Sequence, residues 1–130
     1  MPLVVWCPEC WQENPVEATH CEACGAELWS EKGDRVTRLI RALHHPVAET
    51  RQFVAVCLGK TNEPRAIQAL GEAAQRAIAE RDWALLDGVT EGLAECGTTE
   101  VRPWLEYIAK HGYVGARRLA ERALAKPLEE

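Results

Sequence analysis

Four cysteines near the start of this sequence constrain its fold most strongly. They form two Cys-x-x-Cys pairs, Cys7 with Cys10 and Cys21 with Cys24, separated by ten residues. Two thiolates spaced in this way can lie on one tight turn with both sulfur atoms facing one point. Two such turns supply the tetrahedral set of four sulfur ligands that Zn²⁺ accepts. We therefore predict that these four cysteines bind one structural zinc ion.

The segment that carries the cysteines is too short to fold on a hydrophobic core alone. In zinc-finger peptides the metal supplies on the order of 10 kcal/mol of folding free energy. Four thiolates also close the coordination shell, whereas a catalytic zinc keeps one position open for water. The spacing thus indicates a metal that folds the module and takes no part in catalysis.

Other interpretations of these cysteines exist. The run from Trp6 to Cys10 superficially resembles a thioredoxin or glutaredoxin active site, which requires a βαβ context and leaves the second pair unexplained. Iron in a rubredoxin-like site is chemically possible, although such proteins carry more aromatic packing around the metal. His20 precedes Cys21 directly and could replace a ligand or hydrogen-bond a sulfur; an exposed histidine is the simpler interpretation.

The segment Trp-Cys-Pro-Glu-Cys-Trp, followed by His-Cys-Glu-Ala-Cys-Gly-Ala-Glu-Leu, resembles the short zinc-ribbon family found at the ends of many prokaryotic proteins. That family has two knuckles joined by a short loop. Trp11 stands where the family more often has glycine after the second cysteine, whereas Gly25 provides the expected glycine in the second knuckle. The resemblance implies a zinc ribbon over residues 1–30.

The charge of the chain is unevenly distributed. Residues 1–30 contain five acids and no Lys or Arg, whereas the remaining hundred residues contain fifteen of each sign. Because nucleic-acid affinity comes mainly from phosphate neutralisation by Lys and Arg, the N-terminal module is a poor candidate for that role. Nucleic-acid binding through the ribbon stays only as an alternative.

Residues 31–130 have a composition and periodicity that predict an all-helical domain. The punctuating residues predict six helices. The first is capped by Asp34 and broken at His44-His45-Pro46, the second runs from Val47 to Leu58 with Gly59 after its end, and the third opens at Asn62-Glu63-Pro64. The fourth is capped by Asp82 and closed by Gly97, the fifth follows possible caps at Thr98 and Thr99 and stops at Gly112, and the sixth runs from Val114 to Ala125 before Pro127.

The sequence of the six predicted helices indicates a repeating unit of two helices. Gly59 and Gly97 lie thirty-eight residues apart, and each precedes a polar stretch, a proline and an apolar helix. The segment 50–58 resembles the segment 116–124, sixty-six residues later, which is about two periods of thirty-three. Helix pairs at such a period are typical of an α-solenoid, which needs about three units to be stable.

Two runs, Leu-Ile-Arg-Ala-Leu-His-His-Pro and Glu-Thr-Arg-Gln-Phe-Val-Ala-Val-Cys-Leu-Gly, resemble HEAT repeats of the short bacterial kind that also occur in phycobilin lyases. The middle unit departs from this pattern, since it carries Asp87-Gly88 and no arginine at the matching place. The resemblance implies a mainly α fold: an α-solenoid of about three HEAT-like helix pairs, preceded by the small Cys₄ zinc ribbon.

Further residues with chemical potential have simpler interpretations. Cys57 and Cys96 fall on apolar stripes and are predicted to be buried small hydrophobes, and His44-His45 occupies a turn. Arg117, Arg118 and Arg122 form a basic stripe that could bind an acidic surface or simply face solvent. The sequence offers no phosphate-binding glycine loop, no nucleophile elbow and no paired carboxylates with a supporting histidine, so we predict that the chain is not an enzyme.

These observations predict a cytoplasmic protein with no membrane segment that binds an unidentified protein through its helical surface. We expect the ribbon to cap the first helix pair, with Trp6 or Trp29 at the join, because solenoid ends expose apolar surface. An accessory factor or enzyme of the bilin-lyase-like class is the alternative that the HEAT resemblance raises. The sequence specifies neither the partner nor the oligomeric state.

Overall fold

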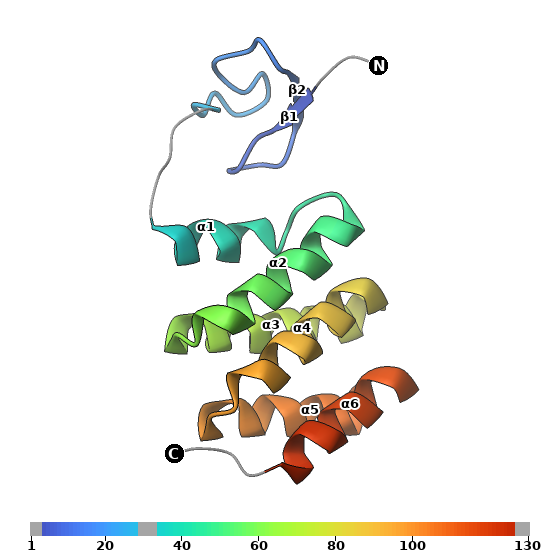
Figure 1. The fold of residues 1–130 in the computed structure, drawn as a ribbon. Helices are drawn as coiled ribbons and strands as arrows, with labels where there is room; N and C mark the ends of the chain where they lie inside the picture. Colours follow the sequence, from blue (N-terminus) through green and yellow to red (C-terminus); the bar gives the residue numbers. More distant parts are fainter. Residues whose placement is uncertain (1–3, 29–33, 127–130) are drawn as a thin grey trace.

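Two short strands and six α-helices make up the described part of the chain, residues 4–28 and 34–126 of a computed structural model (Figure 1). The strands β1 and β2 pair antiparallel, with Val5 opposite Asn14. The elements are β1 (Val4–Trp6), β2 (Glu13–Pro15), α1 (Arg35–Ala42), α2 (Ala48–Thr61), α3 (Pro64–Glu80), α4 (Trp83–Cys96), a 3₁₀ turn (Thr99–Val101), α5 (Arg102–His111) and α6 (Val114–Ala125). The prediction of a mainly helical chain is therefore confirmed.

The helices form antiparallel pairs that lie one below another (Figure 1). Helices α2, α4 and α6 contact each other in that order on one side, and α1, α3 and α5 do so on the other. One hydrophobic core runs through all three pairs. Its largest fully buried side chains are Leu58, Leu70, Leu85, Leu86, Leu93, Leu105 and Ile108.

Helix ends follow the predicted signals at several points. The side chain of Asp34 accepts a hydrogen bond from the Thr37 amide, and that of Asp82 accepts one from the Leu85 amide, so both act as N-caps. Gly97 ends α4 with φ at 68°, in the left-handed region that suits glycine. The predicted threonine caps of the fifth helix are wrong, because a 3₁₀ turn intervenes and no side chain caps α5.

The prediction that Gly59 follows the end of the second helix is also wrong. Helix α2 continues to Thr61 and ends at Asn62, whose φ is 58°. Gly59 instead lies inside the helix, where a Cβ atom would come within 2.3 Å of the Gly92 carbonyl oxygen. The glycine is needed because two helix backbones touch there, so Asn62 is the structural counterpart of Gly97.

Helix α4 brings two further glycines to the same contact. A Cβ atom on Gly88 would lie 2.4 Å from the Gln52 carbonyl oxygen, and one on Gly92 would lie 2.6 Å from that of Ala55. The Asp87-Gly88 departure from the repeat pattern therefore has a packing reason: α4 approaches α2 closely along one side.

Helical spacing predicts an inward face of Val47, Val54, Cys57 and Leu58, with Phe53 alongside, on the second helix, and of Leu119, Ala120 and Leu124 on the sixth. Val54, Leu58 and Ala120 are buried as predicted, whereas Phe53 is 68% exposed, the N-cap residue Val47 is also exposed and Cys57 is half-buried. On α6, Ala116, Ala120 and Ala123 are buried while Leu119 and Leu124 are half-buried. The buried positions of α6 are alanines because α4 and α5 pack closely against this helix. The predictions for Trp29 and Pro127 fall outside the described residues, and no described helix is long and apolar enough to cross a membrane.

Candidate metal centre

The two cysteine pairs lie on turns of the same construction. In the first turn, the Trp11 amide donates a hydrogen bond to the Cys7 carbonyl at 2.7 Å. In the second, the Gly25 amide donates to the Cys21 carbonyl at 2.9 Å. A further amide in each turn, from Glu9 or Ala23, lies 3.4 Å from the first sulfur of the pair. The chain thus builds two equivalent knuckles, each of which presents two sulfur atoms on one side.

The four predicted cysteines come together at the point where the knuckles meet. All four Sγ atoms lie within 4.8 Å of one another. The Cys7–Cys24 and Cys10–Cys21 Sγ separations are both 3.6 Å. A tetrahedral shell with metal–sulfur bonds of about 2.3 Å has edges of about 3.8 Å, so the observed separations fit such a shell. This cluster can hold a metal ion.

The ionisation of the four thiols favours a cation between them. Hydrogen bonds from the backbone amide of Cys24, from the Asn14 side chain and from the amide of Ala23 lower the pKa of Cys21 to about 6. The Gln12 amide lowers the pKa of Cys10, yet desolvation and the neighbouring thiols together raise it to about 12. Four thiolates at this spacing repel one another, and a bound cation removes that repulsion as the protons leave.

Asn14 connects the two knuckles and was missed by sequence reasoning. Its side chain is 1% exposed. The Nδ2 atom donates to the Gln12 carbonyl at 3.0 Å and lies 3.5 Å from the Cys21 sulfur, while Oδ1 accepts a hydrogen bond from the Glu22 amide at 2.9 Å. A strand of three residues carries too little periodicity to single out such a residue. Asn14 holds the second knuckle in register with the first.

His20 does not join the cluster of four sulfur atoms. Its ring is exposed, and its Nδ1 lies 3.1 Å from the Thr19 hydroxyl. Its backbone forms an isolated bridge with Glu27. The simpler interpretation of His20, an exposed residue beside a ligand, is confirmed.

Trp11 adopts the backbone conformation that glycine has in the second knuckle. Its φ is 62°, and that of Gly25 is 79°. A residue with a Cβ atom is destabilised in this region by roughly 1–2 kcal/mol. The first knuckle therefore keeps its turn in spite of the tryptophan, whose indole contacts His45.

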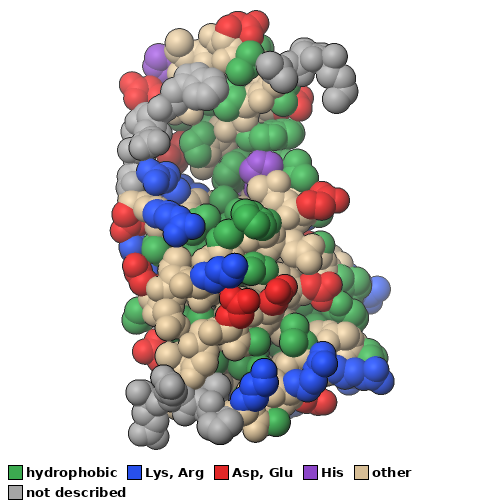
Figure 2. All heavy atoms as spheres, viewed as in Figure 1, with side chains coloured by type: hydrophobic (Ala, Val, Ile, Leu, Met, Phe, Trp, Pro, Cys, Tyr) green, Lys and Arg blue, Asp and Glu red, His purple; other side chains and the backbone are tan. Residues whose placement is uncertain are grey.

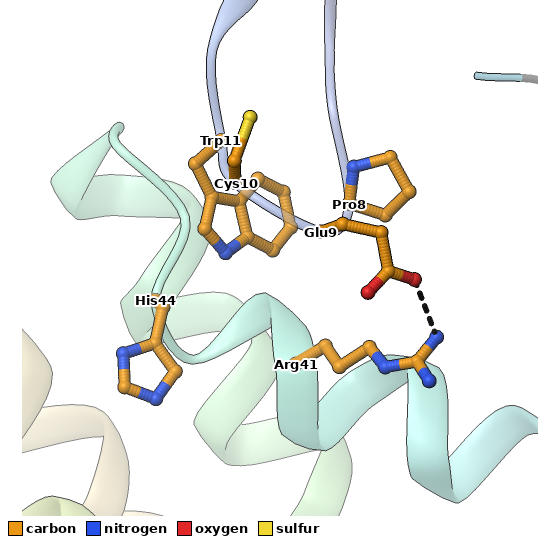
Figure 3. A pocket seen from close by; sticks show the side chains of 6 residues that line it. All are labelled: Pro8, Glu9, Cys10, Trp11, Arg41 and His44. Atoms are coloured by element: carbon orange, nitrogen blue, oxygen red, sulfur yellow. Dashed lines mark ion pairs between the residues drawn. The ribbon is translucent and has the colours of Figure 1, made fainter. Parts of the chain in front are cut away.

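The indole of Trp11 and that of Trp6 both contact the turn between α1 and α2. The ring centroids of Trp11 and His45 are 5.1 Å apart, and those of Trp6 and His45 are 5.7 Å apart, both in edge-on arrangements. Beside them Glu9 forms an ion pair with Arg41 at 3.5 Å (Figure 3). An open hollow of about 310 Å³ lies between the first knuckle and the end of α1. Trp11, Arg41 and His44 are among the residues that line it.

The turn that carries His45 is itself firmly held. Arg51 donates hydrogen bonds to the carbonyls of His45 at 2.7 Å and Pro46 at 3.1 Å, and it forms an ion pair with Asp82 at 3.1 Å. Arg76 donates to the Leu43 carbonyl at 2.6 Å. The His45 imidazole therefore contacts Trp6 and Trp11 from a position that residues of α2 and α3 and the N-cap of α4 determine.

Comparisons with models of known protein families, with curated proteins and with solved structures find no match for this chain.

Proposed function

We propose that this chain is a non-catalytic protein-interaction scaffold in which a zinc ribbon caps a short HEAT-like α-solenoid. The exposure of Phe53 is the observation that carries the interaction role. At 68% exposed it is the most exposed large hydrophobic side chain of the described residues, and it lies on the solvent side of α2. Exposed aromatic side chains of this kind are typical anchors of protein interfaces.

The donor set supports zinc as the metal. Four sulfur ligands at tetrahedral spacing suit Zn²⁺ or an iron ion. We assign zinc, held by Cys7, Cys10, Cys21 and Cys24, because the hydrophobic side chains packed with the buried cysteines are aliphatic: Val5, Ala18, Ala26 and Leu28. Metal analysis of the purified chain by mass spectrometry should find one zinc per chain, and one iron would contradict the assignment.

The order of the helix pairs supports a HEAT-like solenoid. Helices α2, α4 and α6 begin at Ala48, Trp83 and Val114, which gives intervals close to the period in the sequence. Each of them contacts the next along the stack. A solenoid of only three units gains from a cap at its end. The contacts of Trp6 and Trp11 with His45 make the ribbon suitable for that role.

The capping role can be tested by removing the metal. A chelator should lower the melting temperature of the helices, measured by circular dichroism at 222 nm, because the ribbon loses its fold. The Trp11→Gly variant is the matched probe, since it relieves the strained φ of the knuckle and removes the contact with His45. It should keep the metal but show a smaller effect of chelation on the helices. Helices that melt unchanged after metal removal would contradict capping.

The interaction role can be tested by affinity capture from the native host with the whole chain as bait. The Phe53→Glu variant should lose a partner that the wild-type chain captures, and Val16→Glu, which alters an exposed apolar residue of the ribbon, should retain it. Capture that Phe53→Glu does not affect would contradict this surface. Saturable binding of a bilin, or salt-sensitive binding of DNA or RNA to the ribbon, would favour the alternative classes.

A further inference from the structure

Helices α4 and α6 present rows of opposite charge on one face of the molecule. Figure 2 shows acidic side chains over α4 and basic ones over α6. The row on α4 is Asp87, Glu91 and Glu95, and this helix contains no Lys or Arg. The row on α6 is Arg118, Arg122 and Lys126 at its C-cap. We propose that this face binds a second copy of the chain and forms a two-fold symmetric dimer.

The two rows share one register. Within each row successive charges are four residues apart, and each base lies thirty-one residues after the corresponding acid. The starts of the two helices offer apolar side chains at the same interval, since Trp83 is 37% exposed and Val114 is 50% exposed. Each acid of α4 therefore corresponds to a base of α6, and Trp83 corresponds to Val114, at one common interval in the sequence.

The two helices also run in the same direction with their starts side by side (Figure 1). The rings of Trp83 and Tyr113 have centroids 5.2 Å apart, and the Tyr113 hydroxyl donates a hydrogen bond to Asp87. These contacts fix the first turn of α4 beside the first turn of α6. Charges thirty-one residues apart on the two helices therefore lie within about one helical turn of each other along the helix direction.

A two-fold axis that runs between α4 and α6, parallel to both, places α4 of each copy on α6 of the other. The rotation keeps the height along the helix, so Glu91 meets Arg122 of the second copy and Trp83 meets Val114. Both charge rows are satisfied at once by one operation, as an isologous interface requires. An unrelated acidic or basic partner would satisfy one row and oppose the other.

The charges at the centre of this face are free to take partners from another molecule. Glu91, Glu95, Arg118 and Arg122 are all exposed. None of the four forms an ion pair within residues 4–28 and 34–126. Asp87 is engaged by Tyr113 and contributes less than the other two acids. Glu121 also lies on α6, so the basic row is not purely of one sign.

Charge-reversal variants of the complete chain, purified with zinc, test the dimer. Light scattering after size-exclusion chromatography should give twice the 14.5 kDa of the chain for the wild type. Salt should dissociate it, since the Debye length falls from about 10 Å at 0.1 M to about 3 Å at 1 M. Glu91→Arg with Glu95→Arg, and separately Arg118→Glu with Arg122→Glu, should each weaken association about tenfold or more.

The decisive measurement is the mixture of the two variants. At a concentration where the wild type is dimeric, each variant alone should be mainly monomeric, whereas the mixture should form a heterodimer, because each acidic surface then meets a basic one. Glu100→Arg with Glu106→Arg is the matched control, since it reverses two acids off this face and should leave the dimer intact. A monomeric wild type at low salt, reversed variants that still dimerise, or a mixture that stays monomeric would each overturn the proposal.

This inference extends the proposed function from Phe53 on α2 to the exposed surface of α4 and α6, and the two proposals can fail separately. Dimerisation is measured on the purified chain and does not involve Phe53. A monomeric chain that still captures a partner through Phe53 would refute the dimer and leave the interaction role standing.

Discussion

Replacing Gly59 by alanine tests the close contact between α2 and α4. The added Cβ atom would lie 2.3 Å from the Gly92 carbonyl oxygen and 2.4 Å from the Gly92 Cα atom. Carbon atoms make favourable contacts at about 3.5–4.0 Å, so the two backbones would have to separate by about 1 Å. No side-chain rotation can relieve the overlap, because both obstructing atoms belong to a helix backbone.

Two effects of opposite sign determine the size of the change. Alanine stabilises a helix interior by about 1 kcal/mol relative to glycine. Overpacking of a well-packed core costs about 1–3 kcal/mol, and a backbone obstruction lies at the upper end. We therefore expect a net loss of about 2 kcal/mol in the free energy of unfolding. For a chain of this size that corresponds to a fall of roughly 6–10 °C in melting temperature.

Thermal and urea unfolding, followed by circular dichroism, should measure this loss. Gly115→Ala is the matched control, because it makes the same change at an exposed helical position where only the Tyr113 ring stands nearby, at 2.8 Å. The Tyr113 ring, which also contacts Trp83 and Asp87, has to shift slightly, and the gain in helix propensity offsets that cost, so the control should unfold within about 1 kcal/mol of the wild type. If Gly59→Ala is as stable as Gly115→Ala, the helices do not meet backbone to backbone at this glycine.

Two other changes probe the ribbon and its junction. Asn14→Ala should lower metal affinity by about 10–100-fold, because it removes the hydrogen bonds between the knuckles. Competition with a chelating dye measures this affinity, and the control Gln12→Ala should leave it unchanged. Equal affinities of the two variants would refute the linking role of Asn14. The pKa of His45 is lowered by burial and then by Arg51, so the folded state favours the neutral ring. Stability present above about pH 6.5 should therefore decline as the pH falls below it, and in urea unfolding His45→Gln should show a shallower decline than the wild type.

Local signals in the sequence were sufficient for several of the helix ends. The Asp34 and Asp82 caps, Pro64 in the first turn of α3 and the left-handed Gly97 follow from rules about helix ends. The two sulfur atoms of each knuckle are brought together by the spacing within each pair, and two such pairs indicate a set of four ligands. These features need no knowledge of which helix packs on which.

Features that depend on distant contacts could not be predicted in this way. Gly59 has the sequence context of a helix end, but a helix that begins twenty-four residues further along the chain requires it to be glycine. Asn14 is buried because two knuckles enclose it. The outward position of Phe53 depends on which side of α2 the close contact with α4 occupies. In each case the role of the residue depends on a segment that lies far away in the sequence, which a short stretch of sequence does not contain.

The strained turn at Trp11 has a consequence for the metal as well as for the helices. The indole is set against His45 only while the backbone at residue 11 keeps its positive φ, and the folded knuckle imposes that conformation. Metal binding and the packing of Trp11 on His45 are two coupled equilibria, and such coupling is reciprocal. A metal that stabilises the packing is therefore bound more tightly when the packing is present. An isolated ribbon peptide would lose that contribution and bind its ion more weakly than the same residues do in the intact chain. The helices are therefore expected to raise the affinity of the four-cysteine cluster for its metal, although none of their residues is a ligand.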